Sequence, residues 1–152
     1  MKKIIFSLFV ALLIYNAGLA QTAPGNQNLT ADSAAIKKAA LDYVEGFYNS
    51  DPKRIAEGVY PELVKRIVHK DAGGDAIQDM SASLLMLAAR KNKKNDPDPS
   101  VPFKADVTIY DIFNDNATIK IVTNKFKFID YAQLAKMDGE WKIINVLWAM
   151  SK

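Results

Sequence analysis

Apolar residues recur at helical spacing in the first part of the chain and alternate with polar residues further along. The helical set comprises Ile36, Ala39, Ala40, Tyr43, Val44 and Phe47. These positions share one helix face, so they predict an amphipathic helix over about residues 33–49, capped by Thr30 or Asp32. The Asp51-Pro52 pair predicts a short second helix that ends just before Gly58.

The pattern changes after the second helix. Residues 63–69 (LVKRIVH) have the composition of a strand, and residues 76–80 predict a return strand after a turn at 71–75 (DAGGD). Ser81 is placed to cap a third helix, and residues 92–102 have the composition of a loop.

From Phe103 onward the sequence predicts only strands. They are ADVTIYDIF, ATIKIVTNKFKF and a closing hairpin that turns at Asp138-Gly139. The order is therefore helix, helix, hairpin, helix and several antiparallel strands. This order predicts an α+β domain in which the helices pack on one face of a curved sheet.

The N-terminal segment has the features of an export signal. Two lysines at positions 2 and 3 precede an apolar run from Ile4 to Tyr15, and Gly18-Leu19-Ala20 supplies small residues for cleavage. The run is too short to span a bilayer comfortably. We therefore predict a signal peptide over residues 1–20, cleaved near Ala20-Gln21, and a periplasmic or secreted protein.

The mature chain has the size of one domain, at residues 31–152, after a flexible polar leader at 21–30. Without Lys2 and Lys3 the 20 basic residues fall to 18, against 17 acidic ones, which argues against a nucleic-acid-binding protein. The absence of cysteine and the single histidine, His69, exclude thiolate chemistry and zinc sites built from cysteines or several histidines. We expect no metal, no cofactor and no membrane contact after cleavage.

The element order and three motifs resemble the nuclear transport factor 2-like superfamily. The motifs are LDYVEGFYNSDPKRI, YPELVKR, and DYAQLAKMDGEWKI followed by NVLW, and they span most of residues 40–148. More narrowly, they resemble the family labelled putative lumazine-binding. The resemblance implies a cone-shaped domain whose bent sheet wraps around a long first helix. The superfamily includes isomerases, dehydratases, hydrolases and non-catalytic binding modules, so the fold does not select a function.

A second resemblance, to ketosteroid isomerases, concerns chemistry. Tyr43 matches a tyrosine that donates to the substrate oxyanion in those enzymes. Asp130 matches an acid that an apolar site keeps protonated as a second donor, and Trp148 matches a further position. The carboxylate base of those enzymes falls on Ile67, which cannot move a proton. His69 lies two residues further along, on the same strand face.

Two functions follow from these residues. The first is a binding module that holds a small, largely apolar or heteroaromatic molecule between the first helix and the sheet. Its candidate ligand-binding residues are Tyr43, Phe47, Phe128, Asp130 and Trp148. The alternative is an isomerase- or dehydratase-type enzyme with Tyr43 and Asp130 as oxyanion donors and His69 as candidate base. The missing carboxylate base favours binding over catalysis.

Each candidate also has a purely structural interpretation. Tyr43 can be a core tyrosine, and Asp130 can be an acid on the sheet surface or paired with a neighbouring lysine. Lys65, Arg66 and His69 can belong to a solvated edge strand, where charged side chains discourage edge-to-edge pairing.

The face that carries Asp130 depends on the turn at Asp138-Gly139. A two-residue turn places Asp130 opposite Leu147, whereas a three-residue loop that begins at Met137 places it on the face of Trp148. We expect the three-residue loop.

Both faces of the last hairpin carry large apolar residues, among them Phe128 and Tyr131. A sheet with one face in water shows a cleaner alternation of apolar and polar residues. We therefore predict a homodimer that forms through the sheet.

Overall fold

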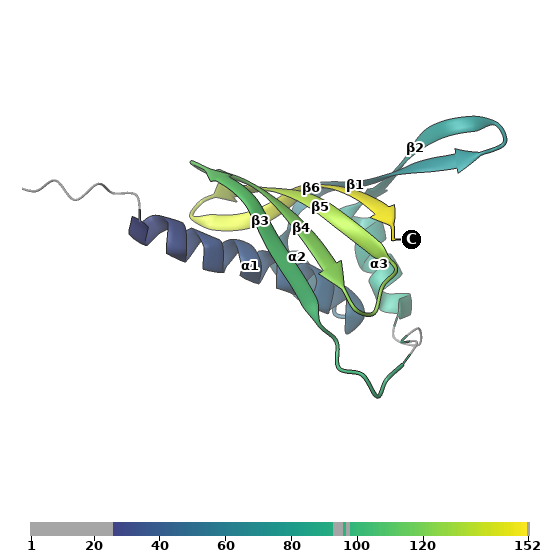
Figure 1. The fold of residues 1–152 in the computed structure, drawn as a ribbon, viewed down its shortest axis with the longest axis horizontal. Helices are drawn as coiled ribbons and strands as arrows, with labels where there is room; N and C mark the ends of the chain where they lie inside the picture. Colours follow the sequence, from purple (N-terminus) through teal and green to yellow (C-terminus); the bar gives the residue numbers. More distant parts are fainter. Residues whose placement is uncertain (1–25, 93–95, 97, 152) are drawn as a thin grey trace, which may run out of the picture.

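The computed structural model describes residues 26–92, 96 and 98–151. The elements of this part follow the predicted order (Figure 1). They are the helices α1 (Asn26–Tyr48), α2 (Pro52–Gly58) and α3 (Ala82–Asn92), and the strands β1 (Val59–Asp71), β2 (Gly74–Ser81), β3 (Ala105–Phe113), β4 (Asn116–Thr123), β5 (Phe128–Met137) and β6 (Glu140–Met150). The predicted signal peptide lies outside the described residues. Within them, no helix combines the length and the apolar character that a membrane span requires.

The strands form one sheet in the order β2-β1-β6-β5-β4-β3. β1 and β6 run parallel, and the other neighbours run antiparallel. Figure 1 shows α1 running along one face of the sheet, while the β1–β2 hairpin projects beyond it. On β4 the buried positions are Ala117, Ile119, Ile121 and Thr123, which alternate with less buried ones. The predicted α+β architecture, with helices on one face of a curved sheet, is confirmed.

The contact between α1 and α2 depends on a cap and a glycine. The Asp51 side chain accepts hydrogen bonds from two backbone N–H groups in the first turn of α2, and Pro52 follows it, as predicted for this helix start. A Cβ atom at Gly58 would lie 2.3 Å from the carbonyl oxygen of Ala39. Only glycine therefore allows the end of α2 to approach the backbone of α1 this closely.

The last hairpin turns through two residues, so the predicted three-residue loop is wrong. Met137 pairs with Glu140, and both Asp138 (φ 51°) and Gly139 (φ 83°) have the positive φ angles of a two-residue hairpin turn. A glycine at the second position and a short polar residue at the first accommodate this geometry.

A β-bulge nevertheless places Asp130 on the face of Trp148. Gln133 pairs with Asn145 but Leu134 pairs with Ile143, which leaves Ile144 as an extra residue on β6. The extra residue shifts the register by one position, so Asp130 pairs with Trp148. Asp130 therefore shares a face with Trp148, as expected, but because of the bulge and not because of a three-residue loop.

The first helix starts earlier than its apolar pattern indicates. It begins at Asn26, within the segment predicted as a leader, so neither Thr30 nor Asp32 is its cap. The Asp32 carboxylate instead accepts hydrogen bonds from Lys136 Nζ (2.8 Å) and Trp141 Nε1 (2.9 Å) on the last hairpin. These bonds fix the N-terminal half of α1 against the sheet.

β1 is not an edge strand, so the interpretation of its charges as edge protection is wrong. It lies between β2 and β6. Leu63 and Lys65 face the helices and are buried, while Val68, His69 and Lys70 lie in the projecting part and are exposed.

Candidate functional site

Three polar side chains from distant parts of the chain meet in the core. They are Tyr43 on α1, Lys65 on β1 and Asp130 on β5, which are 2%, 5% and 1% exposed. Lys65 Nζ lies 2.5 Å from Asp130 Oδ1 and donates to the Tyr43 hydroxyl at 2.6 Å. That hydroxyl donates to Asp130 Oδ2 at 2.9 Å. Every member of this group, which we call the buried triad, is bonded to the other two.

The periodicity of each element places these side chains. Tyr43 lies next to Val44 on the buried stripe of α1. Lys65 follows Leu63 by two residues on β1, so both side chains point toward the helices. Asp130 occupies the first fully buried position of β5, on the inward face. The triad therefore forms where α1 crosses the inner faces of two strands.

Burial controls the charge states of the triad. It raises the pKa of Tyr43 well above its usual value, an effect that the negative Asp130 reinforces, so the phenol stays neutral. Burial also lowers the pKa of Lys65, while the charge of Asp130 and the hydrogen bond to it act in the opposite direction. The lysine thus loses its proton more easily than an exposed lysine does.

A cavity of about 100 Å³ lies beside the triad. Its apolar lining consists of Phe47, Met80, Leu85, Ala88, Phe128 and Trp148, and Tyr43 and Lys65 complete it. Lys65 Nζ lies 4.9 Å from the ring centroid of Phe128 and 5.1 Å from that of Trp148, within the range of cation–π attraction. One end of an otherwise apolar cavity therefore carries an ammonium group.

Five of the residues expected at a ligand site lie together. Phe47, Phe128, Trp148 and Tyr43 line the cavity. Asp130 is bonded to Tyr43 and to Lys65, the other two members of the triad. This places the aromatic and the polar candidates in one region, at the position where the sequence predicts a pocket between the first helix and the sheet.

His69 does not line the cavity, so the expectation that it points toward the base position is wrong. Its side chain is 57% exposed, and its Nε2 lies 3.5 Å from Asp71 Oδ2. His69 lies on the same strand face as Ile67. It pairs with Ala76 in the β1–β2 hairpin, which projects beyond the helices (Figure 1).

Lys65 was missed as a site residue from the sequence, because its charged neighbours indicated a solvated strand. The signal that identifies it is its alternation with Leu63 and Ile67, which are less polar and share its face. A lysine in such a row is buried with its neighbours when the strand is internal.

The sequence model of the family described as "Putative lumazine-binding" matches residues 31–149. The chain belongs to this family. No curated protein matches the chain.

Solved structures with the same fold include proteins of unknown function and one with a named activity. A nuclear transport factor 2-like protein of unknown function from Silicibacter pomeroyi is 12% identical, covers 80% of this chain and 98% of its own, and has a TM-score of 0.65. One from Shewanella baltica is 20% identical, with coverages of 81% and 96% and a TM-score of 0.64. A protein of Novosphingobium aromaticivorans described as "Putative Scytalone Dehydratase" is 12% identical, and the similarity covers 82% of this chain and 87% of that protein, with a TM-score of 0.56. Similarity at these identities shows the fold alone.

The hydrogen bonds of Tyr43 and Asp130 differ from those that these two residues would need as oxyanion donors. Tyr43 gives its proton to Asp130, and Asp130 accepts from both Tyr43 and Lys65. Both carboxyl oxygens of Asp130 therefore accept hydrogen bonds in this arrangement, and neither is placed to donate one to a ligand. Only Lys65, which has three N–H groups and uses two of them within the triad, can donate to a molecule in the cavity.

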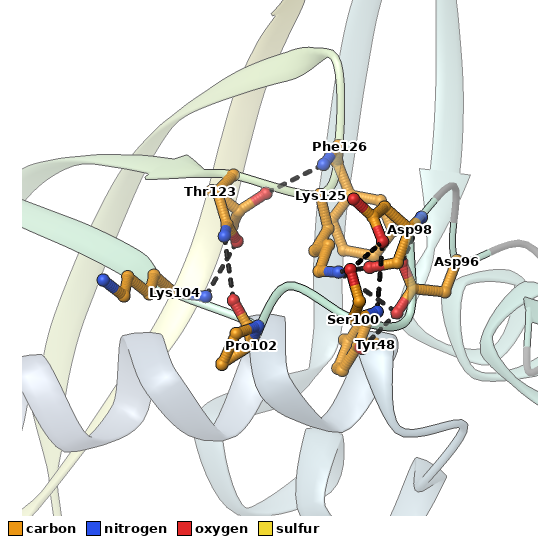
Figure 2. Close-up of polar contacts among 10 residues, drawn as sticks. Tyr48, Asp96, Asp98, Ser100, Pro102, Lys104, Thr123, Lys125 and Phe126 are labelled. Carbon is orange, nitrogen blue, oxygen red and sulfur yellow. Dashed lines mark hydrogen bonds and ion pairs between the residues drawn. The ribbon is translucent and has the colours of Figure 1, made fainter.

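A second buried lysine, Lys125, bonds to Asp96 and Asp98, which lie between α3 and β3. Figure 2 shows Lys125 surrounded by Asp96 and Asp98. Its Nζ lies 2.9 Å from Asp96 Oδ1 and donates to the backbone oxygen of Asp98. Tyr48, at the end of α1, donates to the other oxygen of Asp96 at 2.5 Å. The hydrogen bonds from Tyr48 and Lys125 lower the pKa of Asp96.

This anchor supports the aromatic wall of the cavity. Tyr48 stacks on Phe103 at 4.6 Å between ring centroids, and Phe126 stacks on Phe128 at 5.1 Å. Phe128 contacts Trp148 edge to face at 5.8 Å. Through the edge-to-face contact of Tyr48 with Phe126, the rings from Phe103 to Trp148 form one continuous aromatic cluster that includes the cavity wall.

A larger pocket, of about 230 Å³, lies between α1, α2 and the last hairpin. Its charged residues pair with one another: Lys38 with Asp42 at 2.6 Å, and Lys142 with Glu140 at 3.1 Å. Neither sign of charge dominates, so the pocket indicates no class of ligand. The residues that the structure describes contain no cluster of potential metal ligands.

Proposed function

We propose that the protein is an exported binding module that holds one small aromatic or heteroaromatic molecule in the cavity beside the buried triad. The observation that supports the proposal is an aromatic-lined cavity with a single polar end, provided by Lys65. Ligand sites typically combine apolar walls with a few placed polar groups. The family description supports a ligand of this kind, and the basic and apolar N-terminal segment supports export.

The volume favours a molecule of about one ring. An apolar cavity of about 150 Å³ holds benzene, so a cavity of about 100 Å³ encloses slightly less than one ring. Phe47, Met80 and Trp148 are only partly buried, which leaves the cavity open to solvent on one side. A two-ring molecule such as lumazine would fit with its second ring at this opening.

The polar end selects ligands that carry a hydrogen-bond acceptor. The third N–H group of Lys65 can donate to a carbonyl, a hydroxyl or a ring nitrogen. Asp130 compensates the charge of the ammonium, so the end is electrically balanced without a ligand. A neutral acceptor therefore binds better than a second carboxylate.

Tryptophan fluorescence provides a direct test. Trp148 lines the cavity, whereas Trp141 is bonded to Asp32 at the other end of the sheet. Titration of a Trp141→Phe variant with lumazine, benzaldehyde oxime and phenol should quench or shift the emission of Trp148, with saturation. Native mass spectrometry of the protein purified from its host should show a bound small molecule. No response to any probe and no retained molecule would contradict the proposal.

A matched pair of α3 variants shows whether the ligand enters this cavity. Ala88→Leu adds side-chain volume to the cavity wall and should abolish the response. Leu87→Ala removes a 46% exposed side chain from the next position and should leave it unchanged. Equal binding by both variants would locate the ligand elsewhere.

The enzymatic alternative has less geometric support. It needs Tyr43 and Asp130 as donors, and their hydrogen bonds are directed within the triad. A dehydratase or isomerase activity that disappears in Tyr43→Phe would restore it.

We also propose a homodimer that forms through the outer face of the sheet. Tyr131 and Leu147 form a cross-strand pair on this face and are 45% and 49% exposed. Light scattering at micromolar concentration should give twice the monomer mass for the mature chain, and Leu147→Asp should give a monomer. A monomeric wild-type protein would contradict the dimer.

A further inference from the structure

We propose that Lys65 forms a reversible imine with small aromatic aldehydes that enter the cavity. The inference names a ligand class, aromatic carbonyl compounds, for the site of the proposed function, and it rests on that function in so far as the cavity admits a small molecule. Lys65 carries the only amine among the residues that line the described cavity, and the Tyr43 hydroxyl is bonded to Asp130.

The geometry brings together the three groups that an imine needs. Lys65 Nζ lies at the cavity wall, where an aldehyde carbon can approach it. Asp130 Oδ1 lies 2.5 Å from this nitrogen and can hold its proton. The ring centroids of Phe128 and Trp148 lie 4.9 Å and 5.1 Å from the nitrogen, so these rings can stack on the aromatic part of the aldehyde.

The first step is a proton transfer within the triad. The Lys65 ammonium gives a proton to Asp130, which converts a buried ion pair into a neutral amine and a neutral carboxylic acid. An apolar environment favours this exchange relative to water, because it disfavours both charges. The burial that lowers the pKa of Lys65 acts in the same direction.

The remaining steps return the proton. The neutral amine forms a C–N bond to the carbonyl carbon, and the nitrogen proton moves to the carbonyl oxygen, which gives a carbinolamine. Asp130 then protonates the hydroxyl, which leaves as water while the nitrogen lone pair forms the C=N bond. The products are a protonated imine, one water and the Asp130 carboxylate, which again pairs with a cation. Hydrolysis reverses the sequence, so no oxidant or cofactor is required.

Reductive trapping tests the proposal on the folded wild-type protein. The mature protein is incubated with benzaldehyde and cyanoborohydride, and the modified lysines are located by peptide mapping. We expect one benzyl group on Lys65, added about tenfold faster than on the exposed Lys37 and Lys53, since an amine with a lower pKa has a larger neutral fraction. Benzyl alcohol, which has the same ring but no carbonyl group, should slow the labelling of Lys65 and not that of Lys53.

Two variants separate covalent chemistry from ordinary labelling. Lys65→Arg keeps a cation beside Asp130 but has no amine, so the rapid labelling should be lost while that of Lys37 and Lys53 continues. Asp130→Asn increases the neutral fraction of the amine but removes the acid that protonates the departing hydroxyl, so the labelling of Lys65 should still slow. The wild-type peptide map decides the question even where a variant fails to fold.

The results distinguish this inference from the proposed function. Labelling of Lys65 no faster than that of Lys53 would overturn the imine, and it would leave the binding function intact if Trp148 fluorescence still responds to benzyl alcohol. Rapid labelling of Lys65 without any saturable fluorescence response would support the imine and contradict the binding module.

Discussion

The buried pair of Lys65 and Asp130 predicts strong energetic coupling between the two positions. Their side chains are 6% and 1% exposed, and their charged atoms lie 2.5 Å apart. In Lys65→Met or Asp130→Leu, one charge stays buried without its partner, which costs about 3–5 kcal/mol. In the double variant both charges are gone, and replacing a buried ion pair by apolar residues is typically neutral or stabilising by about 1–4 kcal/mol.

The third member of the triad modifies this expectation. In the double variant the Tyr43 hydroxyl loses its acceptor, and an unsatisfied buried hydroxyl costs about 1–3 kcal/mol. The double variant should therefore unfold with a free energy within about 2 kcal/mol of the wild-type value. The summed losses of the two single variants are several kcal/mol larger than the loss expected for the double variant. Adding Tyr43→Phe to the double variant should recover the stability that the unsatisfied hydroxyl costs.

Urea unfolding monitored by circular dichroism measures these free energies. The exposed pair of Lys70 and Asp75, 2.9 Å apart with side chains 75% and 60% exposed, is the matched control. Lys70→Met should change stability by less than about 1 kcal/mol. The reasoning is refuted if Lys65→Met behaves like Lys70→Met, or if the losses of the single variants simply add in the double variant.

The pH dependence of Asp130→Asn follows from the same pair. Burial lowers the pKa of Lys65, and the substitution removes both effects that raise it. At a pH between this lowered pKa and the lysine value of 10.5, the unfolded chain binds more protons than the folded chain, so stability increases with pH in that window. The stability of Asp130→Asn relative to wild type should therefore improve as the pH rises toward 10.5. The comparison belongs below pH 10.0, because the raised pKa of Tyr43 makes the folded state lose stability as the pH rises above that value.

Other parts of the fold give further expectations. Trp141→Phe removes a 2.9 Å hydrogen bond to the Asp32 carboxylate and should cost about 1.5–3 kcal/mol in urea unfolding. The hydrogen bonds from Lys136 and Trp141 lower the pKa of Asp32, so the stability that they provide is present above pH 3.8 and is lost as the pH falls through the lowered pKa. Trp141→Phe should therefore lose less stability on acidification than wild type does. Gly58→Ala places a Cβ atom 2.3 Å from the Ala39 carbonyl oxygen and should cost about 1–3 kcal/mol or prevent folding, whereas Gly73→Ala in an exposed turn should change the melting temperature little.

The local parts of the fold were predictable because they depend on few residues. The cap at Asp51, the helix start after Ser81 and the tight turn at Asp138-Gly139 each follow from a side chain or a backbone preference within a few positions. The start of α1 was not, because polar residues before Ser33 contribute no apolar periodicity.

The register of the last hairpin shows where local rules stop. The turn residues allow two loop lengths, and the three-residue loop that we expected is not the one formed. The observed two-residue turn alone would place Asp130 opposite Leu147. The bulge at Ile144 reverses the outcome. Nothing in the immediate sequence marks this position.

The position of Lys65 depends on the neighbours of its strand. A lysine that alternates with apolar residues faces either water or the core, depending on which sheet face the helices cover. Lys65 shares its strand face with Leu63, which is buried under the helices, so the lysine faces inward and meets Asp130 there. His69 has the same parity but lies where the hairpin leaves the helices, and it stays in solvent.

Lys65 changes the chemistry that this scaffold offers relative to the resemblance with ketosteroid isomerases. An oxyanion hole needs a tyrosine and a neutral acid that both present protons to the substrate. Here the ammonium bonds to both groups: the Asp130 carboxylate balances its charge, and the Tyr43 hydroxyl gives its proton to Asp130 instead of to a ligand. What remains for a ligand is one cationic donor that can also become a nucleophile. The same contact that removes the isomerase geometry therefore supports selective binding of acceptors, and carbonyl compounds are the acceptors that such an amine can also capture.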